Sequence, residues 1–153
     1  MASTTATPIT IQTRTAAYAD AEPILKMLAE MRPDRERTNL IHQSITTRTC
    51  HVAVVDGQVV AFAIVQPSFF GFPFIQFLFV DPLQRRRGVG RALIRHIEAH
   101  CPVKKLFVAI ERSQVVLQAF FIRAGFVASG SVENVSDIDA HLIYFKKPAG
   151  LAG

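Results

Sequence analysis

The stretch from Phe77 to Ile94, FLFVDPLQRRRGVGRALI, constrains the fold more than any other part of the sequence. An apolar strand ends at Val80, Asp81-Pro82 turns the chain outward, and apolar residues then recur at helical spacing to about His100. The strand is apolar on both faces, which is typical of a central strand covered from both sides. The segment therefore predicts a strand–turn–helix unit at the centre of a layered domain.

The rest of the chain predicts further strands and helices of one mixed sheet. Apolar runs bounded by turn residues indicate strands, and Asp56-Gly57 between two of them is a strong hairpin signal. Expected strands are Ile9–Arg14, His51–Val55, Val59–Val65, Phe74–Val80, Lys105–Ile110, Phe126–Ser129 and Ala140–Phe145. Expected helices begin at Asp20 and cover Glu36–Arg48, Val89–His100 and Gln114–Ala124. This order predicts an α/β (α+β mixed sheet) class with helices on both faces of the sheet.

The uncharged run Val59–Val80 is long enough for a membrane span, which needs about 20 apolar residues. Gln66-Pro67-Ser68 and Gly71-x-Pro73 interrupt it, so two buried strands joined by a turn are expected instead. The start of the chain lacks the basic and apolar stretches of a secretory signal. Cys50 and Cys101 are far apart and are expected to be reduced thiols of a cytoplasmic protein. We expect a disordered tail over 1–8, a single domain over 9–147 and a flexible tail over 148–153.

Positive charge is concentrated beside the predicted helix start. The chain carries a formal net charge of +5, and Arg85, Arg86, Arg87, Arg91 and Arg95 crowd one short stretch. A helix N-terminus exposes unpaired N–H groups, and the glycines at 88 and 90 let the backbone approach an anion. Together with flanking arginines, this arrangement favours a diphosphate ligand.

Three other interpretations fit this stretch less well. A dinucleotide fingerprint needs a glycine tight against the strand and a third one further on, but seven residues separate Val80 from Gly88 and Leu93 occupies the third place. A basic nucleic-acid patch lacks interleaved aromatic residues on a polar face. A solvated arginine-rich turn does not explain two glycines where a helix must start.

Two motifs resemble those of the GNAT superfamily of N-acetyltransferases. Arg85-x-x-Gly88-x-Gly90, after a strand ending Val-Asp-Pro, is similar to the acyl-CoA signature, and Phe120–Phe126, FFIRAGF, is similar to the end of a later family helix. The resemblance spans Ile9 to Phe145 and implies a GNAT-like acyl-CoA N-acyltransferase fold. It also implies that the parallel strands Phe74–Val80 and Lys105–Ile110 splay apart around acetyl-CoA.

The resemblance further implies a set of cofactor contacts. Backbone N–H groups from Arg86 to Arg91 would hold the pyrophosphate, and the backbone of Leu78–Val80 would pair with the pantetheine arm. A strand N–H near Leu78 or Phe79 would polarise the thioester carbonyl. The expected cofactor-binding residues are Leu78, Phe79, Val80, Arg85, Arg86, Arg87, Gly88, Val89, Gly90, Arg91, Gln114 and Phe121.

The sequence departs from the family pattern where proton transfer is expected. Phe121 replaces the tyrosine that commonly protonates the departing thiolate, Gln114 replaces an asparagine, and Gln76 is the only polar side chain of the central strand. Candidate catalytic residues are therefore Glu111 and Tyr144, with His141 as another residue of the last strand. Because strand side chains alternate, His141 and Tyr144 are not expected to face the same side.

The remaining polar and aromatic features have competing interpretations. Acidic Glu30, Asp34 and Glu36 would attract a cationic acceptor or lie at a solvated helix start. His96 and His100 are expected on an exposed helix face, and no metal is expected. The aromatic turn Phe69–Pro73 is a lid on the core, an acceptor-pocket wall or a homodimer contact.

The expected function is acetyl transfer from acetyl-CoA to a primary amine, with no nucleic-acid or membrane partner. The alternative is an acyl-CoA-binding regulatory module with weak or lost catalysis, which Phe121 and the absent strand carboxylate suggest.

Overall fold

The structure, a computed structural model, describes residues 9–29, 35–100, 105–135 and 139–146. Its strands are β1 (Gln12–Thr15), β2 (Cys50–Val55), β3 (Gln58–Phe69), β4 (Phe72–Val80), β5 (Leu106–Glu111), β6 (Val127–Val132) and β7 (His141–Lys146). Its helices are α1 (Ala21–Leu28), α2 (Arg35–Thr46), α3 (Val89–His100) and α4 (Val115–Arg123), with short 3-10 turns at Tyr18–Asp20 and Pro82–Gln84. This order of elements is the predicted one. The predicted tails over 1–8 and 148–153, and Glu30, Asp34 and Cys101, lie outside the described residues.

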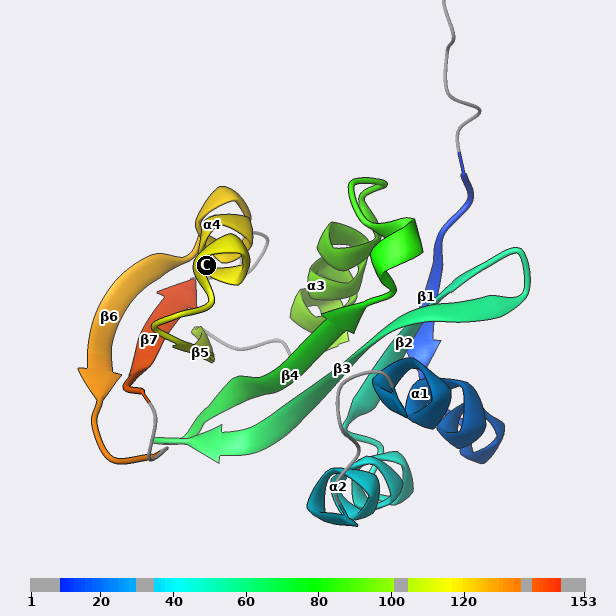
Figure 1. The fold of residues 1–153 in the computed structure, drawn as a ribbon, viewed down its shortest axis with the longest axis horizontal. Helices are drawn as coiled ribbons and strands as arrows, with labels where there is room; N and C mark the ends of the chain where they lie inside the picture. Colours follow the sequence, from blue (N-terminus) through cyan, green and yellow to red (C-terminus); the bar gives the residue numbers. More distant parts are fainter. Residues whose placement is uncertain (1–8, 30–34, 101–104, 136–138, 147–153) are drawn as a thin grey trace, which may run out of the picture.

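The seven strands form one mixed sheet in the order β1-β2-β3-β4-β5-β7-β6 (Figure 1). Neighbouring strands are antiparallel except β4 and β5, which are parallel and joined through α3. The mixed α/β class predicted from the sequence is therefore confirmed.

Helices pack on both faces of the sheet. α1 and α2 share a buried apolar cluster with one face of β2, β3 and β4, in which Ile24, Ile41 and Phe62 are almost fully buried. On the other face, α3 contributes Leu93 and Ile97 to a second cluster, which also holds residues of α4 and β5. The alternation of strand side chains puts the two clusters on opposite sides of the sheet.

All seven strands differ from their predicted bounds by at least one residue, and the differences at β1 and β3 have a structural cause. The first strand begins at Gln12 and not at Ile9, because its ladder with β2 begins where Gln12 pairs with Val54. Ile9 and Ile11 pack against the core ahead of this ladder. β3 continues to Phe69, past the predicted end at Val65, and the turn to β4 uses Phe70 and Gly71 at φ 51° and 84°. Two consecutive left-handed residues form the tight turn typical of a hairpin.

This hairpin accounts for the uncharged run. β3 and β4 pair antiparallel along most of their length, as a buried pair of strands should. Among the described residues, no helix has the length and apolar character needed to cross a membrane.

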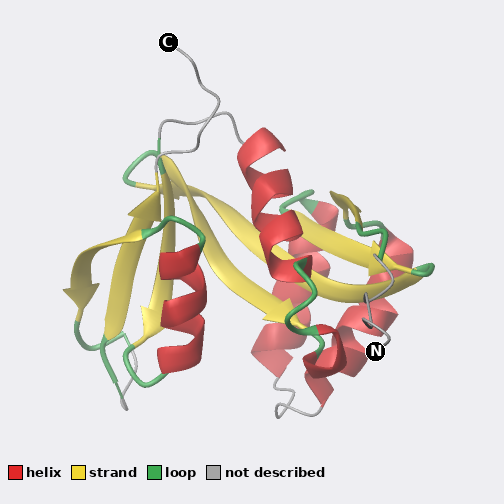
Figure 2. Ribbon diagram, turned by 90° about the horizontal axis from the view of Figure 1, so that it is seen from above, coloured by secondary structure: helices red, strands yellow, loops and turns green. Residues whose placement is uncertain are grey.

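β4 and β5 separate soon after they meet. Their parallel ladder contains only Phe74 with Phe107 and Ile75 with Val108, although β4 continues to Val80. Figure 2 shows the sheet opening into two groups of strands. The predicted splay of the parallel pair is present.

A β-bulge lies where this separation begins. On β3 the consecutive residues Ile64 and Val65 pair with Phe77 and Ile75 of β4, so Gln76 is an extra residue in the β4 ladder. A bulge bends its strand and increases the local twist. Gln76 therefore marks the point at which β4 turns away from β5.

Candidate active site

The loop between β4 and α3 presents a row of backbone donors. Arg86 and Gly88 have φ of 64° and 81°, both in the left-handed region. The first hydrogen bond of α3 runs from the Ala92 N–H to the Gly88 carbonyl at 3.0 Å, so the three N–H groups before Ala92 have no carbonyl of this helix to bond. Left-handed residues interspersed in such a loop direct N–H groups into a concave anion-binding nest.

The two glycines of the motif have different roles. Gly88 is exposed, and a Cβ there would meet no atom within 4 Å, so its left-handed φ is what requires glycine. Gly90 is buried, and a Cβ there would lie 2.9 Å from Cζ of Phe120 on α4 and 3.5 Å from Cγ2 of Val80. The sequence-based interpretation gave both glycines to anion approach, but the contact at Gly90 is with a neighbouring helix.

The arginines around the loop are exposed and partly tethered. Arg85 Nε donates to the carbonyl of Val80 at 3.3 Å, and Arg87 donates to the side chain of Gln84 at 3.4 Å. Arg91 donates from Nη2 to the carbonyl of Arg123, at the end of α4, at 2.8 Å. These contacts hold guanidinium groups close to the helix start, where they reinforce its positive potential.

The expected pantetheine contacts lie along the edge of β4 that faces the gap. Past Ile75, this edge has no ladder with β5, so its backbone groups on that side have no strand partner. Leu78 and Val80 pack against the apolar cluster on the α3 side, whereas Phe79 packs on the α1 and α2 side. Val89 is 1% exposed and anchors the first turn of α3 in the core.

Phe121 lies in α4, and Gln114 directly precedes that helix. Phe121 is fully buried and makes edge-to-face contacts with Phe120 and Phe126. Gln114 is exposed and precedes the helix without a side-chain capping bond. Gln118 binds the carbonyls of Glu111 and Arg112 and fixes the loop that leads into α4.

The candidate proton-transfer residues divide between the two faces of the sheet. Glu111 is directly opposite His141 in the β5–β7 ladder, so both side chains point away from the α3 side. Tyr144 is opposite Val108, is 6% exposed and belongs to the apolar cluster on the α3 side. The structure therefore brings Glu111 together with His141 and not with Tyr144.

His141 has an unsatisfied polar atom. Its Nδ1 is buried and has no hydrogen-bond partner among the described residues. Buried polar atoms normally have a partner from the protein, from ordered water or from a ligand.

Short polar contacts fix the strand ends that carry Glu111 and His141. The Ser113 N–H donates to Asp139 Oδ2 at 2.8 Å, and the Arg112 N–H donates to the Ala140 carbonyl at 3.0 Å. These bonds join the residues after Glu111 to those before His141, so the pair is held at a defined separation.

Of the acidic residues expected near the acceptor, Glu36 belongs to the described residues, whereas Glu30 and Asp34 do not. Glu36 lies in the first turn of α2 and is exposed. Two rings of the aromatic turn pack inward: Phe69 stacks on Phe74, and both Phe69 and Phe72 contact Phe107 of β5. These rings hold the closed end of the β4–β5 pair together. Phe70, between Phe69 and Phe72, is 88% exposed.

The histidines of α3 differ from the sequence-based prediction. His96 is buried, not exposed, and its Nε2 lies 3.1 Å from Nδ1 of His51 on β2. Burial, followed by the charges of neighbouring His96 and His100, lowers the pKa of His51 to about 4. His100 is exposed and stacks on His96. Within the described ranges, no group of three or more His, Cys, Asp or Glu side chains is arranged to hold a metal ion.

Comparisons with known proteins find the same family and fold. The model of the acetyltransferase (GNAT) family matches residues 15–126. An acetyltransferase of the GNAT family from Bacillus cereus ATCC 10987 is 27% identical with a TM-score of 0.85, over 92% of this chain and 99% of that one. The ribosomal-protein-S18-alanine N-acetyltransferase from Escherichia coli is 20% identical with a TM-score of 0.74, over 94% and 99%. A comparison with curated protein sequences finds no match.

A structure that holds coenzyme A has the same fold. PaiA N-acetyltransferase from Thermoplasma acidophilum, in complex with coenzyme A, is 15% identical with a TM-score of 0.66, over 90% of this chain and 99% of that one.

A loop of backbone donors at a helix start, beside a parallel strand pair that splays, defines an acyl-CoA-dependent N-acyltransferase fold. The chain belongs to the GNAT acetyltransferase family. The resemblance drawn from Arg85-x-x-Gly88-x-Gly90 is thus confirmed at the level of family and enzyme class.

Proposed function

We propose that the protein transfers an acetyl group from acetyl-CoA to a primary amine. The observation that carries the proposal is the coincidence of two features at one edge of the sheet: the gap between β4 and β5, and the unpaired N–H groups at the start of α3. A diphosphate on the helix start would leave the pantetheine arm of the same molecule beside the open edge of β4.

The residues present fit a CoA thioester. The open edge of β4 beyond Ile75 offers backbone groups to the pantetheine amides, as an added strand would. Exposed Arg86, Arg87 and Gly88 leave room for the phosphates, and Arg85 is anchored close to them through Val80. Acetyl-CoA would supply a thioester carbonyl that is already activated for attack by an amine.

A β4 N–H beside the gap would polarise that carbonyl, and residues Leu78 and Phe79 are the candidates. Fixed backbone donors stabilise the charge that develops on oxygen without having to reorganise. The amine nitrogen forms the new C–N bond, the C–S bond breaks, and one proton moves overall from nitrogen to the thiolate sulfur.

Glu111 and His141 are the groups we assign to proton removal from the amine. They are cross-strand partners at the end of the sheet where β4 and β5 have separated. Directly opposite side chains have Cβ atoms about 4.5–5.5 Å apart, so one amine nitrogen or water could contact both. The Glu111 carboxylate would attract a cationic acceptor, and the imidazole nitrogen of His141 beside it would accept the proton.

Phe121 supports direct attack of the amine on the thioester, without a protein side chain that protonates the leaving sulfur. It is fully buried and offers no proton, and Tyr144 packs in the core on the α3 side. The CoA thiolate would then leave unprotonated and collect its proton from solvent, since a thiolate is a fair leaving group.

Thiol release from acetyl-CoA, followed across a panel of primary amines, tests the activity. Glu111→Gln and His141→Gln should each lower kcat/KM by about 10²-fold with CoA affinity unchanged, because a general base contributes about 10²–10⁴. Glu22→Gln, which neutralises an exposed carboxylate on α1, is the matched control and should leave the rate unchanged.

Turnover that is absent with every amine, in a protein that binds CoA, would favour the alternative of an acyl-CoA-binding module. A pH–rate profile of Glu111→Gln identical to that of the unmodified protein would remove Glu111 from the mechanism.

A further inference from the structure

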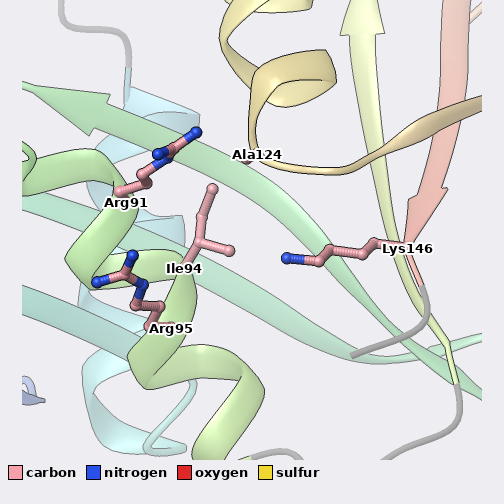
Figure 3. Close-up of a pocket in the computed structure, with 5 residues that line it drawn as sticks. All are labelled: Arg91, Ile94, Arg95, Ala124 and Lys146. Carbon is pink, nitrogen blue, oxygen red and sulfur yellow. The ribbon is translucent and has the colours of Figure 1, made fainter. Parts of the chain in front are cut away.

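A cationic pocket of about 130 Å³ lies between α3, the end of α4 and the end of β7. Figure 3 shows its five lining residues, which are Arg91, Ile94, Arg95, Ala124 and Lys146. Three of the five are positively charged: Arg91 and Arg95 come from α3, and Lys146 comes from the end of β7, far away in the sequence. The volume far exceeds the roughly 10–15 Å³ that holds one water molecule, so the pocket has room for a polyatomic anion.

Existing contacts fix two of the three cations and leave the pocket positive. Lys146 Nζ forms an ion pair with Glu98 Oε1 at 2.9 Å, and Arg91 is held by its bond to the Arg123 carbonyl. Arg95 is exposed, and Glu98 is the carboxylate that contacts these cations among the described residues. One carboxylate does not balance three cations, so an anion is the ligand that this pocket favours.

The end of α4 is shaped so that Lys146 can reach the pocket. A Cβ on Gly125 would lie 3.1 Å from Cε of Lys146, and Gly125 has φ of 100°. Glycine therefore lets the stem of Lys146 lie directly against the end of the helix. The contact directs the ammonium group toward α3, as Figure 3 shows.

The pocket is next to the proposed diphosphate site. Arg91 lies in the first turn of α3, whose N–H groups would hold the diphosphate, and Arg95 is one turn further, about 6 Å along the axis. In CoA, the ribose that bears the diphosphate at its 5′ oxygen also bears a phosphate monoester at its 3′ oxygen. One sugar ring thus separates the two anionic groups, which matches two adjacent cationic sites.

We infer that this pocket binds the 3′-phosphate of the CoA substrate and makes the enzyme select CoA over dephospho-CoA. The inference rests on the proposed function. A phosphate monoester carries a charge of about −1.5 to −2 at pH 7 and three acceptor oxygens, which suits Arg95, Arg91 and Lys146. Ile94 and Ala124 are the apolar residues of the lining.

Titration calorimetry with CoA and with dephospho-CoA tests the assignment on the full chain. The unmodified protein should bind CoA about 10- to 100-fold more tightly, since a hydrogen bond between charged groups contributes a factor of this size. Arg95→Gln should reduce this preference to near unity while the affinity for dephospho-CoA stays unchanged. Lys146→Gln should reduce it in the same direction.

Arg48→Gln is the charge-matched control, because Arg48 is exposed and follows α2 on the other face of the sheet. It should keep the full preference for CoA. Equal affinities for the two nucleotides in the unmodified protein would overturn the inference and leave the proposed acetyl transfer standing. Binding of neither nucleotide would overturn both.

Discussion

Gly90 of α3 and Phe120 of α4 approach each other so closely that a Cβ on the glycine would lie 2.9 Å from the ring. The two helices therefore meet at a position where a side chain fits only if the phenylalanine moves. This contact lies immediately beside the N–H groups assigned to the diphosphate, so helix packing and ligand binding share one residue.

Gly90→Val should lower the free energy of unfolding by about 1–3 kcal/mol, the usual cost of overpacking a filled site. Removing the obstacle with Phe120→Leu in the same chain should recover part of this loss. Urea denaturation of the two single variants and the double variant measures the coupling. Strictly additive losses would show that the two residues do not collide.

Gly88→Ala tests the loop conformation separately from helix packing. A left-handed φ costs an L-residue about 1–2 kcal/mol, so the loop should relax and its N–H groups should lose their alignment. We expect CoA affinity to fall at least about tenfold, the size of one charge-assisted hydrogen bond. Gly57→Ala, at φ 75° with the same open surroundings, should cost similar stability and leave CoA affinity unchanged. Equal effects of the two variants on affinity would rule out a special role for Gly88.

The buried His51–His96 contact predicts a loss of stability in mild acid. Burial lowers the folded-state pKa of His51 to about 4, whereas its ordinary value is 6.5. The unfolded chain therefore takes up a proton first as the pH falls, and stability should decrease between about pH 6.5 and 4. At 1.36 kcal/mol per unit, the loss approaches about 3 kcal/mol. His51→Leu should weaken the dependence in this window, as judged by urea midpoints at several pH values. A smaller part should remain, because burial also lowers the pKa of His96. An unchanged dependence would contradict the assignment.

Asp20 should control stability in a lower pH window. Its carboxylate accepts hydrogen bonds from Arg14 at 3.0 Å and from the Ala17 N–H at 2.7 Å, and the bond with Arg14 lowers its pKa below 3.8. Because the folded pKa is depressed, this stability is present above the ordinary pKa and is lost as the pH falls through the folded one. Asp20→Ala should cost about 2 kcal/mol at pH 7, and Asp20→Asn less, because the amide oxygen can still accept from Ala17. An Asp20→Asn variant as stable as the unmodified protein would show that the charge contributes nothing.

Local signals in the sequence were sufficient to predict the framework of the fold. The Asp56-Gly57 turn, the helix start at Val89 and the helix stop at Gly125 each depend on neighbouring residues, and all three are present. The family motif predicted the parallel pair, because that motif depends on a strand followed directly by a glycine-bearing helix start.

Features that depend on distant partners could not be predicted in this way. His96 is buried because His51, 45 residues earlier, lies against it. The Gln76 bulge is not apparent in the sequence, since the residues around it are apolar on both faces of the strand. Lys146 joins the arginines of α3 only through the return of β7 beside β5.

Amide NMR spectra recorded during titration with CoA test the central claim most directly. If main-chain donors at the start of α3 hold the diphosphate, the amide resonances of Gly88, Val89, Gly90 and Arg91 should shift strongly as CoA saturates the protein. The amides of His42 and Gln43, in α2 on the other face of the sheet, should stay in place. Saturable binding of CoA that leaves the Gly88–Arg91 amides unmoved would contradict the account.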